Sequence, residues 1–203
     1  MTDVRLATAS DVEAMAAMLT RAFAHDPFYA YLAGDAPERN ERMRQGWVGI
    51  LRHASDRLST TYTTDDHAGA AIWHPPGYAG ASFLGSLRLM PSVARLAGGL
   101  RRLREVSRAI SALEERRAHH VPRPHYYLSA LGVEPARQGE GIGSALVAPV
   151  LERARTDGVP AYLETATARN VLLYERLGFA VVEELTLPGT DVHGWLMTRA
   201  SPT

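Results

Sequence analysis

Three glycines at alternate positions constrain this chain more than any other feature. The segment that contains them is Gln138, Gly139, Glu140, Gly141, Ile142 and Gly143. It follows an alternating aromatic and aliphatic run at 125–133 and precedes apolar residues at helical spacing. Glycines at a helix start let backbone N–H groups approach an anion closely, and the helix dipole favours negative charge there. The pattern predicts a pyrophosphate-binding turn between a strand and a helix.

A dinucleotide-binding fold uses similar glycines, but with different spacing. Its fingerprint is Gly-x-Gly-x-x-Gly near the start of a βαβ unit, followed by an acidic residue about 20 positions later. Here Gly139, Gly141 and Gly143 recur at every second position, with only about 60 residues after them. The spacing disfavours the dinucleotide fold, and a plain glycine-rich helix start remains an alternative.

Composition excludes several kinds of chemistry. The chain has no cysteine, and all 22 of its basic residues are arginine. Disulfides, thiol nucleophiles, lysine Schiff bases and a P-loop lysine are therefore excluded. The 22 basic residues balance 22 acidic ones, which gives no indication of a nucleic-acid or membrane partner. We expect a cytoplasmic protein, because neither a long apolar run nor a leader-like start appears, and no metal, because no cluster has ligand spacing.

Hydrophobic periodicity predicts one mixed α/β domain over residues 1–203. The expected strands lie at 4–7, 59–64, 70–73, 125–133, 161–164, 179–187 and 193–198. Helices are expected at 12–23, with a Ser10 and Glu13 capping box, and at 37–58, after the glycine turn and at 171–177.

Residues 80–120 predict two helices, separated by Pro91 and the glycine pair at 98–99. This insertion is rich in arginine. Its arginines favour a solvated helical face, and a wall for an anionic cofactor tail is the alternative.

Three motifs in order resemble the GNAT acetyltransferase superfamily. Gln138, Gly141 and Gly143 match its pattern of Gln or Arg, two residues, Gly, one residue, then Gly or Ala. Residues 131–135 resemble the strand end before that loop, and Asn170 with residues 174–179 resembles its Asn and Tyr-x-x-x-Gly-Phe element. Within this superfamily the chain is most similar to puromycin N-acetyltransferase and related bacterial small-molecule acetyltransferases, except at residues 75–121, so the puromycin substrate does not carry over.

The resemblance implies a fold and a cofactor. The fold is a mixed, mostly antiparallel sheet of about six to seven strands flanked by helices, with a helical insertion at about 78–121 between the third and fourth strands. Acetyl-CoA would lie between the strands at 125–133 and 161–166, and the acetyl group would pass directly to an amine. The implied cofactor-binding residues are Leu131, Gly132, Val133, Gln138, Gly139, Glu140, Gly141, Ile142, Gly143, Ser144 and Asn170.

The resemblance also implies roles at the thioester. The backbone N–H of Leu131 would stabilise the developing oxyanion, and Gly132 and Val133 would bond the pantetheine. Tyr174 would act on the leaving thiolate, with packing of a short helix as the alternative. Asn170 would bond the pantetheine arm or cap the helix that begins at Val171.

Several side chains are candidates to accept the proton of the amine. His125, Tyr127, Glu164 and His25 are all possible, whereas His74 is more typical of a strand end. Glu164 is favoured because a carboxylate within a strand is costly unless it is paired or functional.

An aromatic run around Asp26 predicts either core or a lid over the acceptor. We expect Asp26, Phe28, Tyr29, His125 and Tyr127 to bind the acceptor. The leading hypothesis is acetylation of a primary amine on a small molecule, such as an antibiotic or a metabolite, by a monomer or homodimer. Alternatives are peptide or protein N-terminal acetylation, and a non-catalytic module that binds acyl-CoA.

Overall fold

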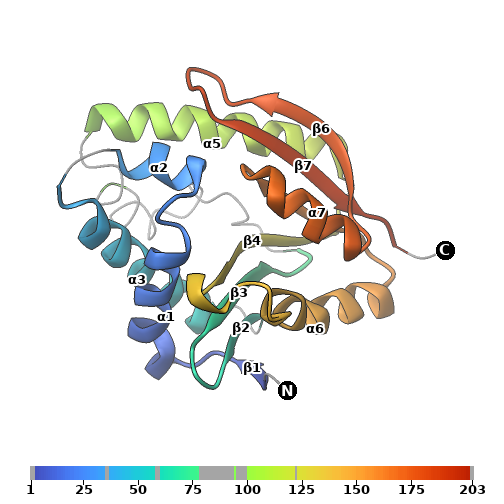
Figure 1. Ribbon diagram of the computed structural model, residues 1–203. Helices are drawn as coiled ribbons and strands as arrows, with labels where there is room; N and C mark the ends of the chain where they lie inside the picture. Colours follow the sequence, from blue (N-terminus) through green and yellow to red (C-terminus); the bar gives the residue numbers. More distant parts are fainter. Residues whose placement is uncertain are drawn as a thin grey trace.

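A seven-stranded sheet in the order β1-β2-β3-β4-β5-β7-β6 forms the centre of the computed structural model (Figure 1), which describes residues 3–34, 37–57, 60–77, 94, 100–121 and 123–201. The strands are β1 (Val4–Leu6), β2 (Thr61–Thr64), β3 (Gly69–His74), β4 (Tyr126–Val133), β5 (Ala161–Thr165), β6 (Ala180–Thr186) and β7 (His193–Arg199). Every neighbouring pair is antiparallel except β4 and β5, which are parallel. The expected mostly antiparallel mixed sheet is confirmed.

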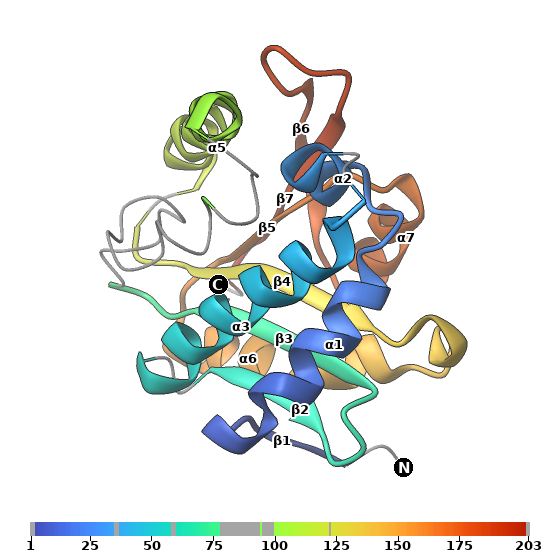
Figure 2. The same ribbon diagram turned by 90° about the vertical axis from the view of Figure 1, so that its left-hand side faces the viewer.

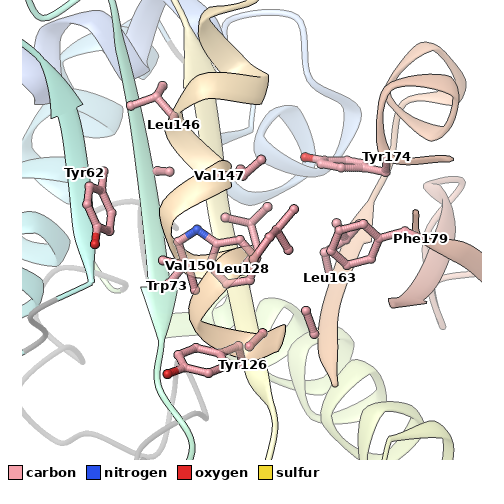
Figure 3. Packing of buried hydrophobic residues seen from close by; sticks show 14 of the residues in the cluster. Tyr62, Trp73, Tyr126, Leu128, Leu146, Val147, Val150, Leu163, Tyr174 and Phe179 are labelled. Atoms are coloured by element: carbon pink, nitrogen blue, oxygen red, sulfur yellow. The ribbon is translucent and has the colours of Figure 1, made fainter. Parts of the chain in front are cut away.

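Helices flank both faces of this sheet. They are α1 (Val12–Ala22), α2 (Pro27–Ala33), α3 (Arg39–Arg57), α5 (Leu100–His120), α6 (Ile142–Asp157) and α7 (Ala168–Arg176). Figure 2 shows α1 and α3 on one face and α6 on the other. On the α6 face, Leu146, Val147 and Val150 pack against β3, β4 and β5 (Figure 3). Among the residues described above, no helix is both long and apolar enough to cross a membrane.

The helical insertion between the third and fourth strands is confirmed by α5. Arg116 and His120 of α5 both pair with Glu183 of β6, the latter through His120 Nε2 at 2.6 Å from Oε2. Figure 1 accordingly shows α5 running beside the hairpin of β6 and β7. The first helix expected in the insertion lies outside the described residues.

Two local features differ from expectation. The capping box before α1 is formed by Thr8 and Asp11, not by Ser10 and Glu13, because a short 3-10 turn at Ala9–Asp11 precedes the helix. The Thr8 N–H donates to Asp11 Oδ2 at 2.7 Å. The additional helix α2 begins at Pro27, within the aromatic run that was expected to form core or a lid, since proline is favoured in a first turn when an Asp precedes it.

A β-bulge divides β4 into two halves. Leu128 pairs with Trp73 and Ala130 pairs with Ile72, so Ser129 is an extra residue without a partner on β3. Because of this extra residue, even-numbered side chains point to one face of the sheet before the bulge and to the opposite face after it. Leu128 therefore packs in the α6 core, whereas Ala130 packs in the core beneath α1 and α3.

Candidate active site

The half of β4 after the bulge has an open polar edge. Its parallel pairing with β5 covers only Tyr126 to Leu128. Beyond the bulge the Glu134 N–H donates to Ala68 O at 2.8 Å, which places even-numbered residues in hydrogen-bonded pairs with β3. The N–H and C=O groups of Leu131 and Val133 consequently point away from β3, toward the gap beside β5. This edge can accept an extended ligand as an additional strand.

Gly132 does not belong to this edge. Its backbone is paired with Ala70 of β3, and its Cα faces α1, where an added Cβ would stand 2.6 Å from Leu19 Cδ2. The expected bond from Gly132 to the pantetheine is therefore wrong. Backbone groups alternate along a strand, so Leu131 and Val133 face the gap while the residue between them cannot.

The glycine turn leaves space above the start of α6. Gly139 and Gly141 have φ of 93° and 82°, and a Cβ at either would meet nothing within 4 Å. The Ala145 N–H donates to Gly141 O at 3.0 Å, and the N–H groups of the three residues before it have no acceptor within the helix. Among these, Gly143 and Ser144 offer only backbone groups and a small side chain, while the Ile142 side chain is buried in the core.

Ion pairs fix the loop before this turn. Arg137 Nη1 lies 2.9 Å from Asp66 Oδ2, and Arg137 Nε lies 2.7 Å from Glu140 Oε2. The Gln138 side-chain amide donates to Val133 O at 3.3 Å. Arg137 thus ties the loop to the turn between β2 and β3, and Gln138 ties it to the end of β4. The residues expected to bind pyrophosphate therefore lie next to those expected to bind pantetheine.

A cavity of about 160 Å³ opens from the gap between β4 and β5. Its lining includes the following residues that were expected in the site: Asp26, Phe28, Tyr29, Tyr127, Leu131, Glu164, Asn170 and Tyr174. Most of the predicted catalytic and acceptor residues therefore come together from separate elements. His125 does not, because it precedes β4 and its ring centroid lies 6.3 Å from that of Tyr162. His74 does line the cavity, stacked on Tyr127 at 5.5 Å.

Glu164 of β5 is a nearly buried carboxylate, with 14% of its side chain exposed. Burial raises the pKa of this carboxyl above its ordinary value, while the Arg117 charge and the Tyr127 and Tyr162 hydroxyls act in the opposite direction. Its Oε1 atom is buried without a hydrogen-bond partner among the described residues. An unsatisfied acceptor of this kind is suited to a donor on a ligand.

Arg117 is a site residue that sequence reasoning missed. It is 6% exposed, with Cζ 4.2 Å from the Tyr127 ring centroid and Nη1 3.8 Å from Glu164 Oε1. A signal existed: Leu103, Val106, Ile110, Leu113 and Arg117 recur at intervals of three and four along α5. The last position of this apolar stripe is the arginine, which identifies it as inward-facing. The arginines of the insertion were interpreted as a solvated helical face or as a wall for an anionic cofactor tail, and a buried Arg117 fits neither interpretation.

Tyr174 of α7 packs in the core and also lines the cavity. It is 5% exposed and packs edge-on against Phe179, with ring centroids 6.0 Å apart, yet it also lines the cavity. Figure 3 shows its ring projecting from α7 toward the middle of the sheet. Burial, and then the Asp26 charge, raise the pKa of its hydroxyl above the ordinary value, so the phenol keeps its proton.

Asn170 and Asp26 have local structural contacts as well. The N-cap of α7 is Thr167 and not Asn170. The side-chain amide of Asn170 instead lies 3.4 Å from Thr165 Oγ1. Asp26 caps α2 by accepting from Phe28 N at 2.9 Å and Tyr29 N at 3.0 Å. Burial raises the pKa of the Asp26 carboxyl, and those backbone donors oppose the shift. No group of three potential metal-ligating side chains is found within the described part of the chain.

The split between two parallel strands, the open edge and the glycine turn define an acyl-CoA-dependent transferase site. The model of the acetyltransferase (GNAT) family matches residues 97–179. Over that region the chain is similar to the GNAT acetyltransferases, a family of acyltransferases that use acetyl-CoA as co-substrate.

Individual proteins resemble this chain along most of its length, the solved structures in their fold. An uncharacterised N-acetyltransferase of Schizosaccharomyces pombe is 26% identical over 88% of this chain and 74% of its own length. A Corynebacterium glutamicum structure described as histone acetyltransferase HPA2 and related acetyltransferase superposes with a TM-score of 0.71 at 21% identity, covering 100% of this chain and 98% of the other. A polyamine N-acetyltransferase of Drosophila melanogaster superposes with a TM-score of 0.65 at 20% identity, covering 98% of each chain.

Proposed function

We propose that this enzyme transfers the acetyl group of acetyl-CoA to a primary amine of a small molecule. The observation that carries the proposal is the cavity beside Leu131, whose volume of about 160 Å³ is close to that of a cavity that holds benzene. Its walls are mainly aromatic and aliphatic, with the carboxylates Asp26, Glu114 and Glu164 and the cation Arg117. An acceptor with a ring-sized apolar body and an ammonium group fits these features. The Drosophila relative is a polyamine acetyltransferase by name, which agrees with a small amine.

The cofactor position follows from the open edge and the glycine turn. Leu131 and Val133 would bond the pantetheine through their backbone groups, as a neighbouring strand would. Gly143 and Ser144 at the start of α6 would bind the pyrophosphate through backbone N–H groups, because Gly139 and Gly141 leave the approach open. Asn170 lines the cavity, and its side-chain amide would contact the pantetheine arm.

The proposed chemistry is direct transfer. Glu164 accepts the proton that the ammonium loses, and the amine nitrogen attacks the thioester carbon. The Leu131 N–H stabilises the oxyanion as the C–N bond forms, which is worth a few kcal/mol for a preorganised donor, about 3–4 in one measured case. The Tyr174 hydroxyl donates its proton to the leaving thiolate as the C–S bond breaks, and the phenolate regains a proton from the attacking nitrogen, which becomes the neutral amide. Its raised pKa keeps the phenol protonated until that step.

Release of free thiol from acetyl-CoA tests the proposal directly. The acceptor panel contains arylalkylamines, linear polyamines, amine-bearing antibiotics, and peptides with a free N-terminus. We expect amine-dependent turnover with at least one small amine and none with the peptides. Turnover with peptides alone would replace the proposal by N-terminal acetylation. Glu164→Gln should abolish turnover with the preferred amine while coenzyme A still binds, and full turnover in that variant would remove Glu164 as the proton acceptor.

A further inference from the structure

Helix α5 delivers one cation into the acceptor cavity. Buried apolar residues of α5, including Leu103, Val106 and Ile110, hold the helix against the rest of the molecule. Arg117 continues the same side of the helix and is itself buried. It provides the one positively charged side chain among the described residues that line the cavity, apart from the titratable His74. A buried guanidinium in an apolar wall is costly, which calls for a compensating role.

We propose that Arg117 is a positioning residue, whose guanidinium keeps Glu164 as a carboxylate oriented toward the acceptor amine. The inference rests on the proposed function, in which Glu164 accepts the proton of that amine. It makes the insertion helix α5 part of the machinery for proton removal, and not only a cover over the acceptor.

Glu164 needs a counter-charge because its surroundings favour the neutral acid. Burial is the largest influence on its pKa and raises it, and the nearby Glu114 carboxylate of α5 raises it further. The opposing groups are Arg117, Tyr127 of β4 and Tyr162 on the same strand. Two further titratable residues, Asp26 and His74, line the cavity. The β7 residues in the lining include Trp195 and Leu196, which are not titratable and so do not affect the charge of Glu164. Without Arg117, the described surroundings contain no permanent cation to oppose burial.

The distance between Arg117 and Glu164 allows the guanidinium to stabilise the carboxylate charge without occupying the oxygen that would bind the amine. Arg117 Nη1 lies 3.8 Å from Glu164 Oε1, which is an ion pair but is too long for a hydrogen bond. Oε1 accordingly has no hydrogen-bond partner among the described residues and is available to the N–H of an acceptor. The guanidinium is held on the face of Tyr127 at 4.2 Å, which fixes its position.

The pH dependence of kcat/KM tests this role. Arg117→Met should move the acidic limb of the profile to higher pH by about one unit or more, since an opposite charge at this range shifts a carboxyl by one to three units. The activity lost near neutral pH should return at alkaline pH. In Arg117→Lys the acidic limb should lie close to its wild-type pH, because the positive charge is kept. Arg108→Met removes an exposed arginine from the same helix and should leave the profile unchanged.

Coenzyme A affinity and the melting temperature are measured for each variant, so that misfolding is recognised. Should Arg117→Met fail to fold, Arg117→Lys and Arg117→Gln are compared, and the limb should move only in the glutamine variant. A uniform loss at every pH would overturn the proposal, because it would show a packing role alone. If Glu164→Gln retains turnover, the proton-acceptor assignment and this inference both fall. If Glu164→Gln is inactive and the limb stays in place without Arg117, only this inference falls.

Discussion

Gly132 of β4 lies directly against Leu19 of α1. A Cβ at residue 132 would stand 2.6 Å from Leu19 Cδ2 and 3.3 Å from the Cβ of Ala22. Helix α1 therefore approaches the sheet closely because this position has no side chain, and the contact lies on the opposite face of the strand from the packed α6 core.

Gly132→Ala should destabilise the protein by about 1–3 kcal/mol, since the added methyl group overfills a packed contact. Urea denaturation measures the change. Gly143→Ala is the control, because a Cβ there meets its nearest neighbours at 3.7 Å, an ordinary contact distance. Equal stability losses in the two variants would contradict the close approach.

Gly141→Ala should raise the KM for acetyl-CoA by about tenfold or more. Its φ of 82° strains any side chain, and the methyl group would occupy the space above α6 that the pyrophosphate needs. Gly189→Ala is a matched control, with φ of 75° and open surroundings in the turn between β6 and β7. Both variants should lose about 1 kcal/mol of stability from backbone strain. The loop assignment fails if the KM changes equally in both.

Tyr174→Phe should lower kcat by about 100-fold or more while the affinity for coenzyme A is retained, because only the proton donor is removed. Tyr126→Phe is the control, since that buried hydroxyl donates to Asp157 at 2.7 Å and is not part of the cavity lining. It should affect stability by about 1 kcal/mol and leave kcat unchanged. Wild-type kcat in Tyr174→Phe would eliminate the phenol as the acid.

We expect the free energy of unfolding to decrease at acidic pH, partly because the Asp11 carboxylate becomes protonated. Hydrogen bonds from Arg5, followed by those from His67 and Thr8, hold the pKa of this carboxyl far below its usual range against the effect of burial. A lowered folded-state pKa means that the stabilisation is complete above the unfolded value of about 4 and is lost as the pH falls below it.

Melting temperatures from pH 7 to pH 2 test this expectation. Asp11→Asn should lose about 2 kcal/mol at pH 7, from hydrogen bonds to a charged group, and should show a flatter decline below pH 4. Asp65→Asn removes the other partner of Arg5, which is 66% exposed, and should change stability by at most about 1 kcal/mol. An unchanged acid decline in Asp11→Asn would assign the acid sensitivity to other carboxyls.

The elements with long, regular periodicity were predictable from the sequence. The alternation in β4, the helical spacing in α1 and the glycine turn each have a local physical cause, and all are confirmed. Helix α2 was missed because seven residues are too few to show a period, and a cap at Asp26 can equally begin a turn. The bulge at Ser129 depends on the pairing of two distant strands, which no local pattern reports.

The same limit explains the errors within the site. Tyr127 and His125 were both expected at the acceptor, but only Tyr127 lines the cavity, because His125 lies outside β4. Gly132 was expected at the cofactor because of the family resemblance, whereas the structure shows that a glycine is needed there for the close approach of α1. Arg117 was predictable in principle from the apolar stripe of α5, although its partner Glu164 lies on a strand far along the chain.

The extra residue at Ser129 makes β4 unusually sensitive to length. A substitution at this position keeps the register, but deletion of one residue would turn the backbone groups of Leu131 and Val133 toward β3 and present the polar groups of the intervening position to the gap. Insertion of a second residue would have the same effect. In this protein, therefore, the number of residues between Leu128 and Leu131 is under stronger constraint than their identity, and engineering of the acceptor cavity can exchange side chains in β4 freely only where that count is preserved.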